Sequence, residues 1–246
     1  MKIVIQPQYQ AASPFISQIP HIFETDGEMV YEGRNIVKRF RINDQEWIIK
    51  RYKNPNLFQQ IAYSFFKKSK AERAYLYANK LRKVGIETPE GIAYIEEKEN
   101  GLLHSSYFVS TACNDPSAFP ALVQTADYDQ NLANNLAAFF VKLHTKGILH
   151  GDPNLSNILY HEDGMGNFHF SVIDTNRSLF KPSLSRNECL DNLKRVTHRR
   201  DLLEYIVKEY ATLRNWDICK SVDTVMEALD KFEKRRRIKR IIARKK

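Results

Sequence analysis

The sequence lacks the features that mark membrane-spanning, secreted and cysteine-rich proteins. Within its 246 residues no apolar run approaches the roughly 20 residues that span a bilayer. The apolar part of the first residues is too short for a secretory signal. Only three cysteines are present, Cys113, Cys189 and Cys219, and none forms a C-x-x-C pair. These scattered thiols exclude a disulfide framework and a cysteine zinc site, and we expect a protein of the cytoplasm.

Acidic residues are scarce only at one end of the chain. The formal net charge is +9, from 38 Lys and Arg against 29 Asp and Glu. The last sixteen residues hold ten of the basic side chains and one acidic one, so the rest of the chain is neutral. Ile238, Ile241 and Ile242 have the spacing of one helical face within this basic tail. A basic amphipathic helix binds anionic lipid, which predicts contact with an anionic membrane surface.

Two other interpretations of the tail stay open, a disordered end and a nucleic-acid contact. No zinc finger, RNP-type strand or helix-turn-helix motif accompanies it, which argues against nucleic acid. A second segment, residues 57–70, also combines large apolar side chains with lysines. Its aromatic residues belong either to the core, with solvated charges around them, or to a second membrane contact.

The first half of the chain predicts an antiparallel meander and one helix. Residues 28–52 are β-rich runs separated by turn signals at Gly33-Arg34-Asn35 and residues 43–45. Small or apolar residues at helical spacing predict a helix over 69–84, which Gly85 ends. Residues 91–96 and 106–110 predict two further strands.

The second half is mainly helical, with helices expected at 132–143 and over 187–233 and a hairpin between. This order predicts an α+β class with a bilobal, protein kinase-like fold. We expect a small antiparallel β-rich N-lobe with one helix over residues 1–111. A reduced, mainly helical C-lobe would follow over 112–233, and a basic tail over 234–246. Clefts between lobes are favoured ligand sites.

A polar loop after the helix at 132–143 carries the chemistry. Asp152 and Asn157 lie five residues apart in it, and Asp174 ends the following hairpin. The hairpin brings Asn157 and Asp174 to the same end, where their oxygens suit Mg²⁺ held with substrate phosphates. We expect the remaining carboxylate, Asp152, to accept a proton from an attacking hydroxyl. With His150, which we expect to be structural, this is the H-x-D-x-x-x-x-N pattern of kinases.

The upstream half supplies the nucleotide-binding groups of that pattern. Lys50 lies on the third predicted strand, and Glu72 follows on the next helix, where it can pair with Lys50. Such a pair aims the lysine ammonium at the α- and β-phosphates of ATP. No G-x-G-x-x-G motif is present, so the phosphate lid must be short and formed near Gly33, Arg34 and Asn35. Three further histidines, His144, His161 and His169, are expected at the surface or in loops.

The loop departs from that of protein kinases. Gly151 precedes Asp152 in place of arginine, Asn154 stands where Ser/Thr kinases carry lysine, and no A-P-E motif follows. The H-G-D-x-N-x-x-N form resembles that of small-molecule phosphotransferases. Five segments narrow this resemblance to the lipopolysaccharide core heptose/Kdo kinase family: residues 72–75, 81–89, 93–94, 173–177 and 189–195.

The resemblance covers most of residues 28–215 and implies a function. It implies ATP, Mg²⁺ and a sugar hydroxyl acceptor on a lipid-linked core, with the enzyme peripheral at the inner face of the cell membrane. Two alternatives stay open, a minimal atypical protein kinase and a catalytically silent kinase-like binding protein. The intact Lys50, Asp152, Asn157 and Asp174 argue against the silent protein.

Overall fold

The computed structural model describes residues 1–244 and divides the chain into two compact units. The first unit comprises Met1–Asn114 together with Asp174–Arg177, and the second comprises Asp115–Ile173 and the chain from Ser178 onward. Four residues from the second half of the chain therefore belong to the first unit. The expected boundaries after residues 111 and 233 stay predictions of domain organisation.

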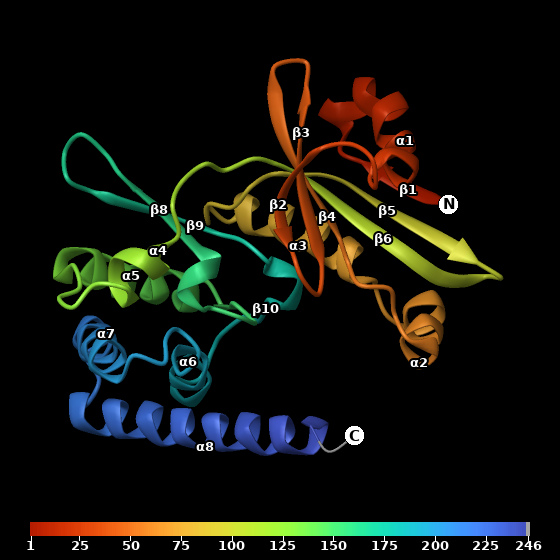
Figure 1. Ribbon diagram of the computed structural model, residues 1–246. Helices are drawn as coiled ribbons and strands as arrows, with labels where there is room; N and C mark the ends of the chain where they lie inside the picture. The colour runs from red at the N-terminus through yellow and green to blue at the C-terminus, as the bar shows by residue number, and fades with distance from the viewer. Residues whose placement is uncertain (245–246) are drawn as a thin grey trace. The chain divides into compact units, whose positions relative to one another are not determined.

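The first unit is built on a six-stranded antiparallel sheet (Figure 1). Its order is β1-β5-β6-β4-β3-β2. The strands are β1 Lys2–Ile5, β2 Glu28–Glu32, β3 Ile36–Ile42, β4 Gln45–Arg51, β5 Gly91–Glu99 and β6 Leu102–Thr111. Five of these were expected from the sequence; β1, at the edge beside β5, was not. Asn43 and Asp44 both have positive φ at the β3–β4 turn, which suits the tight turns of two-residue hairpins.

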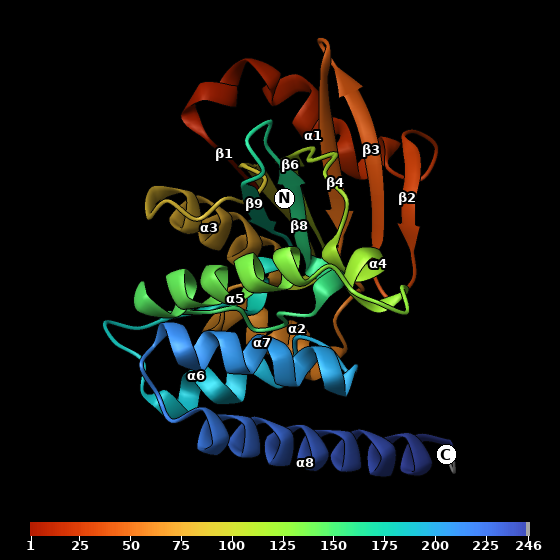
Figure 2. The same cartoon turned by 90° about the vertical axis from the view of Figure 1, so that its left-hand side faces the viewer.

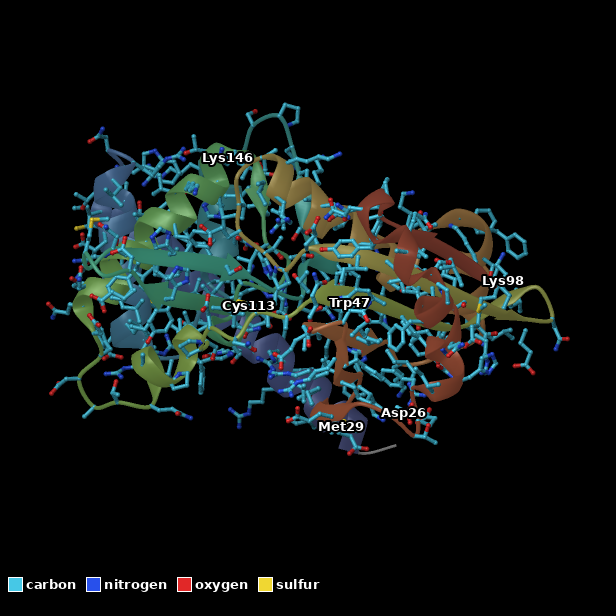
Figure 3. The ribbon with its side chains drawn as sticks, turned by 90° about the horizontal axis from the view of Figure 1, so that it is seen from above. Asp26, Met29, Trp47, Lys98, Cys113 and Lys146 are labelled. Carbon is cyan, nitrogen blue, oxygen red and sulfur yellow. The ribbon has the colours of Figure 1, made fainter. Side chains whose placement is uncertain are left out.

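Helices cover both faces of this sheet. They are the 3-10 helix η1 (Pro7–Ala12), α1 (Ser13–Ile22), α2 (Leu57–Ile61), the π-helix η2 (Ala62–Phe66), α3 (Lys70–Lys83) and the 3-10 helix η4 (Thr175–Arg177). Ile16 and Ile19 of α1 pack with Trp47 and Ile49 in one core cluster. Trp47, labelled in Figure 3, also meets the ring of Tyr9 edge-on, with centroids 5.8 Å apart.

The opposite face of the sheet packs against α3. Ala71 and Ala74 form a second cluster there with Tyr52 and Tyr94. Side chains alternate between the faces of a strand, so Lys50 shares this face with Tyr52, two residues further on. The alanines whose spacing predicted α3 therefore face the side of the sheet on which Lys50 lies.

The second unit is mainly helical (Figure 2). Its helices are α4 Ala118–Val123, α5 Gln130–Thr145, α6 Arg186–Leu193, α7 Arg200–Leu213 and α8 Ile218–Arg244, with the 3-10 turn η3 at Leu155–Asn157. Two short antiparallel pairs complete the unit: β7 Ile148–Leu149 with β10 Leu179–Phe180, and β8 Ile158–Glu162 with β9 Phe168–Val172. The helix α5 packs on α7, which packs on α8. Over residues 1–244, no helix is long and apolar enough to cross a membrane.

His144 lies in the interior of this unit, so the expectation of a surface or loop histidine is wrong. It is buried on the face of α5 that packs against α7. The hydroxyl of Tyr210 lies 2.9 Å from Nδ1, and Asn192 Oδ1 lies 3.2 Å from Nε2. Burial lowers the pKa of His144 from 6.5 to about 4, because the charged ring would lose its hydration.

This burial predicts a pH-dependent stability. The unfolded chain takes up a proton at His144 near pH 6.5, whereas the folded chain resists it until about pH 4. The stabilisation is therefore complete above pH 6.5 and is lost as the pH falls toward 4. We expect urea unfolding to show a loss of about 2 kcal/mol between pH 7 and pH 5 from this group. His144→Gln should flatten that dependence and His21→Gln, at an exposed position, should not; an unchanged slope in the His144 variant would contradict the prediction.

Candidate active site

Lys50 lies in the middle of the sheet of the first unit. Its strand, β4, pairs with β3 on one side and β6 on the other, with Val37 and Phe108 opposite Lys50. The ammonium lies 2.7 Å from Oδ1 of Asp174 and 5.2 Å from the centre of the Tyr52 ring. Both the backbone and the charged end of Lys50 are thereby fixed.

Asp174 is held in an unusual backbone conformation. Its φ is +57°, in the left-handed region that costs energy for a residue other than glycine. The amide of Asn176 donates one hydrogen bond to Oδ1 of Asp174 (3.0 Å) and another to the hydroxyl of Tyr52 (3.1 Å). Burial, and then the Asp174 carboxylate, raise the pKa of Tyr52, so this phenol stays neutral. Tyr52 and Asn176 thus fix the carboxylate that meets Lys50.

Sequence reasoning missed both of these supporting residues. Asn176 stands two residues after Asp174 in a segment already quoted for the family resemblance, so its position was a signal. Tyr52 stands two residues after Lys50 and therefore on the same face of β4. The strand periodicity could have placed Tyr52 next to Lys50, but not its contact with Asn176.

The expected ion pair between Lys50 and Glu72 is not formed, and this prediction is wrong for this structure. The Glu72 carboxylate lies 2.9 Å from the ammonium of Lys68, whose pKa it raises. The face of α3 that packs against the sheet carries Ala71 and Ala74. Glu72 lies about 100° around the helix from Ala71, and there its largely buried carboxylate contacts Lys68 and not Lys50. Asp174 takes the place expected of Glu72 as the partner of Lys50.

The expected phosphate lid, Gly33, Arg34 and Asn35, forms the turn between β2 and β3. The N–H of Gly33 donates to the carbonyl of Asn35 (3.2 Å), and the Asn35 side chain accepts from the N–H of Lys53 (3.2 Å). Arg34 is exposed. Burial, and then the positive charge of Arg34, lower the pKa of Lys70 at the start of α3. The turn thus contributes positive charge near α3, and its contact with a nucleotide stays a prediction.

The polar loop at residues 150–157 belongs to the second unit and is held by side chains. His150 is buried, its Nε2 lies 3.0 Å from the carbonyl of Ile173, and its Nδ1 accepts from the N–H of Asp152 (3.2 Å). The Asn157 amide donates to the carbonyl of Asp152 (3.0 Å). The ring therefore orients the loop, as expected for a structural histidine.

Two residues from a later part of the chain, Asn192 and Arg195, also bind the backbone of the loop. Asn192 of α6 donates to the carbonyl of His150 (2.9 Å), and Arg195 donates to that of Gly151 (2.5 Å). The guanidinium of Arg195 also lies 3.7 Å from the carboxylate of Asp152. Sequence reasoning did not single out Arg195, although it ends a segment quoted for the resemblance.

The residues expected to hold Mg²⁺ have suitable donors. The N–H of Ile173 donates to the carbonyl of Asn157 (3.0 Å), and Asp174 is the next residue along the chain. The side-chain amide of Asn157 uses its nitrogen in the bond to Asp152, which leaves its oxygen as the available donor. An amide oxygen and a carboxylate are ligands that Mg²⁺ accepts, together with phosphate and water oxygens. Among residues 1–244 no group of three or more His, Cys, Asp or Glu side chains forms a metal site of its own.

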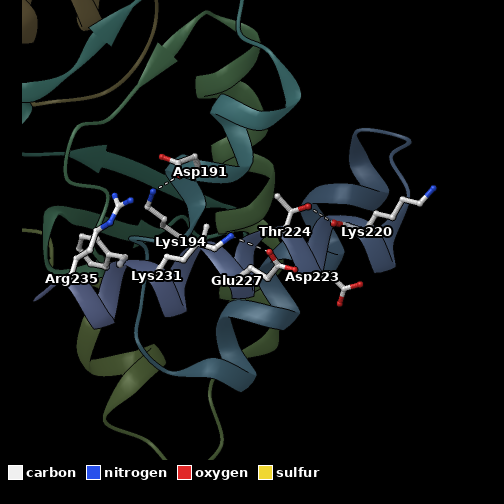
Figure 4. Close-up of a pocket in the computed structure, with 10 residues that line it drawn as sticks. Asp191, Lys194, Lys220, Asp223, Thr224, Glu227, Lys231 and Arg235 are labelled. Carbon is white, nitrogen blue, oxygen red and sulfur yellow. Dashed lines mark hydrogen bonds and ion pairs between the residues drawn. The ribbon is translucent and has the colours of Figure 1, made fainter. Parts of the chain in front are cut away.

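A hollow between α6 and α8 is a poor alternative site. Figure 4 shows that side chains of both charges line it. Lys194 pairs with Asp191, and Lys231 lies 3.2 Å from Glu227. The lining holds four basic and three acidic side chains, and two of the lysines are paired, so the hollow carries little net charge for a charged ligand.

Comparison with known proteins agrees with this geometry. The family model described as lipopolysaccharide kinase (Kdo/WaaP) matches residues 26–219. The chain belongs to this family. It is therefore a phosphotransferase of the lipopolysaccharide kinase type, with an alcohol group as acceptor, and the resemblance seen in the sequence is confirmed. Among the curated proteins, none matches the sequence.

Solved structures establish the fold of this family member. WaaP in complex with acyl carrier protein is similar, with a TM-score of 0.63 and 13% identity over 96% of this chain and 98% of that one. An aminoglycoside-3'-phosphotransferase of type VIII is also similar, with a TM-score of 0.59 and 13% identity over 88% and 98%. The expected kinase-like α+β fold is confirmed.

Because Lys50 pairs with Asp174 and not with Glu72, substitutions of Lys50 and of Glu72 should have unequal effects on activity. Lys50→Met removes the ammonium and should lower kcat/KM by on the order of 100-fold or more, as expected for a cation that stabilises transferring phosphate. Glu72→Gln keeps the shape of a side chain that contacts Lys68, so it should cost at most a few-fold. Steady-state kinetics with varied ATP measures both. A Glu72→Gln loss as large as that of Lys50→Met would show that Glu72 becomes the partner of Lys50 during turnover.

Proposed function

We propose that the chain transfers the γ-phosphoryl group of ATP to a heptose or Kdo hydroxyl of the lipopolysaccharide core. The observation that carries this proposal is the contact between Lys50 and Asp174 within a chain of the lipopolysaccharide kinase family. The retained Asp152 and Asn157 add the remaining groups of the kinase pattern. The catalytic groups are thus Asp152, Lys50, Asn157 and Asp174.

In this proposal the groups of the first unit bind the nucleotide. Lys50 donates to the α- and β-phosphate oxygens, and the backbone of Gly33–Asn35 covers the phosphates. Asp174 and Asn157 would hold Mg²⁺, which when bound would neutralise charge that develops on the phosphate oxygens. Asn176 and Tyr52 keep the Asp174 carboxylate in place for this task.

Asp152 acts on the acceptor. Its carboxylate accepts the proton of the sugar hydroxyl while the hydroxyl oxygen forms a bond to the γ-phosphorus. The bond between the γ-phosphorus and the bridging oxygen breaks, and ADP leaves with that electron pair. Arg195 orients the loop through the Gly151 carbonyl and lies close enough to Asp152 to balance its negative charge.

A substitution of the base tests this mechanism. Asp152→Asn retains the size of the side chain but cannot accept the proton, so transfer should fall by roughly 10²- to 10⁴-fold. Binding of Mg²⁺-ATP, measured by calorimetry, should stay close to that of the unchanged protein. Asp223→Asn, at an exposed position on α8, is the matched control and should retain activity. Wild-type turnover in the Asp152 variant would refute the assignment of the base.

Mass spectrometry of lipopolysaccharide identifies the acceptor. Cells without the gene should lose one phosphate per core, and fragmentation places it on heptose or Kdo. Phosphate transfer to protein, with none to the core, would instead favour the atypical protein kinase. No Mg²⁺-dependent transfer from ATP with any extract would favour the silent binding protein.

We also propose that the enzyme works in the cytoplasm, bound peripherally to the inner face of the membrane through the end of α8. The earlier part of that helix is tied to the second unit, because Arg200 contacts Asp230 (2.7 Å) and Glu233 (2.9 Å). Beyond Arg236 the exposed side chains include Ile238, Ile241 and Ile242. An apolar strip among basic residues at this end of the helix suits anionic lipid.

Truncation tests this location. A chain that ends at Glu233 loses nine basic residues but retains Asp230 and Glu233. It should phosphorylate a soluble core fragment at the normal rate, but its binding to anionic vesicles and its activity on lipid-linked acceptor should fall. Salt should weaken vesicle binding of the full chain, because exposed charges are screened over ~8 Å at physiological ionic strength. Equal co-sedimentation of the two forms would rule out this anchor.

Acyl carrier protein is a second candidate partner, because the structurally similar WaaP was solved bound to it. Gel filtration of the full and truncated chains with acyl carrier protein distinguishes this role of the tail from lipid binding. Co-elution that depends on residues 234–246, together with unchanged vesicle binding, would assign the tail to the protein partner.

A further inference from the structure

An exposed apolar face in the first unit has no role in the kinase chemistry. Residues 57–66 form α2 and the π-helix η2, between Lys50 and α3. Their large apolar side chains point outward: Leu57, Phe58, Ile61, Phe65 and Phe66. We call these five residues the outer face. Phe58 is 85% exposed and Phe66 is 80% exposed, so the alternative in which these aromatic rings belong to the core is wrong.

The amphipathic pattern of this segment is inverted. Gln59 and Gln60 are partly buried, whereas the outer face is exposed: Leu57, Ile61 and Phe65 lie four residues apart, and Phe58 and Phe66 eight apart beside them. The segment is nevertheless anchored to the sheet. Ser64 accepts a hydrogen bond from the N–H of Leu103 on β6 (2.8 Å), and α2 lies beside β6 (Figure 1). A fixed segment that presents its apolar side outward favours an apolar partner.

The charge around the outer face identifies that partner. No acidic residue occurs between Glu46 and Glu72, while this stretch holds six Lys and Arg. Lys53, Lys67 and Lys68 are exposed around the segment, and the nearest acidic residue of α3, Glu72, is paired with Lys68. The acidic residues at the neighbouring end of β5, Glu97 and Glu99, contact Ser105 and His104 of β6. Aromatic side chains flanked by exposed lysines match a bilayer with anionic headgroups, because the rings enter the acyl boundary while the lysines meet the headgroups.

We propose that residues 57–66 are a second lipid-binding surface, whose outer face inserts into an anionic membrane. The surface belongs to the unit that carries Lys50 and is independent of the tail on α8. The inference rests on the proposed function only in that a lipid-linked acceptor requires the enzyme at a membrane. It gives the enzyme a lipid contact on each of its two units.

Vesicle binding of the chain that ends at Glu233 isolates this surface from the tail. In that background, Phe58→Ser with Phe66→Ser should lower partitioning onto phosphatidylglycerol–phosphatidylcholine vesicles by about tenfold for each phenylalanine, because each ring loses its burial in lipid. Met165→Ser with Leu213→Ser removes two exposed apolar side chains of the second unit and is the matched control. Lys67→Gln should weaken binding to anionic vesicles and leave binding to pure phosphatidylcholine unchanged.

Quenching of tryptophan fluorescence by brominated lipid measures membrane insertion directly. Tryptophan at Phe66 (F66W) should be quenched by brominated lipid, whereas tryptophan at Met165 (M165W) should not. Unchanged partitioning of the double phenylalanine variant, or no quenching of F66W in vesicle-bound protein, would overturn the proposal. A dimer that this variant converts to monomer, with partitioning unchanged, would assign the outer face to a second copy and also overturn it.

The same variants separate this proposal from the kinase function. Vesicle binding needs neither ATP nor acceptor, and phosphorylation of a soluble core fragment by the double variant should equal that of its parent. If the unchanged protein does not phosphorylate the fragment, the proposed function fails and the vesicle result still decides the lipid surface.

Discussion

The contact between Lys50 and Asp174 is the interaction on which the active site of the first unit depends. It requires the chain to leave β9, adopt a left-handed backbone at Asp174 and place residues 174–177 in the first unit. Asn176 and Tyr52 offset the cost of this conformation with two hydrogen bonds. A partly buried ammonium without a counter-charge would be strongly destabilising. An anionic ligand at Lys50 must therefore displace Asp174 or bring a cation that binds it, as magnesium-bound phosphates do.

The polar loop at residues 150–157 of the second unit is fixed in a different way, by side-chain hydrogen bonds to three consecutive backbone carbonyls. The carbonyls of residues 150, 151 and 152 each accept from a side chain, namely from Asn192, Arg195 and Asn157 in turn. Because each carbonyl is bound, the loop cannot rotate a peptide without losing a hydrogen bond. This preorganisation suits the role proposed for the Asp152 carboxylate, because the loop need not reorganise before the carboxylate meets an acceptor.

The sequence predicted the elements that have strong periodicity and the residues that carry a spaced motif. Strands β2 to β6, α3 and the hairpin were expected because alternation, alanine spacing and turn residues agreed. The N-terminal β1 and α1 were missed, since α1 is short and contains Pro14 and Pro20. The partner of Lys50 was assigned from the kinase pattern, although the spacing of Ala71 and Ala74 already placed Glu72 off the packed face. Exposure of Phe58 and burial of His144 depend on tertiary packing, which no local pattern encodes.

Helix α8 both contacts the residues that hold the polar loop and carries the basic end of the second unit. The guanidinium of Arg195 stacks over the ring of Phe232 on α8, 5.4 Å from its centre, while Arg195 also binds the Gly151 carbonyl. Phe232 further contacts His198, whose Nδ1 lies 2.8 Å from Glu233. The contacts between α8 and this region extend to Arg236, whose guanidinium lies 3.1 Å from Nε2 of His198, and the apolar strip that suits lipid begins at Ile238. The membrane contact proposed for the helix end uses residues beyond these contacts, so the proposed lipid binding would concentrate the enzyme at its acceptor without a change in the loop.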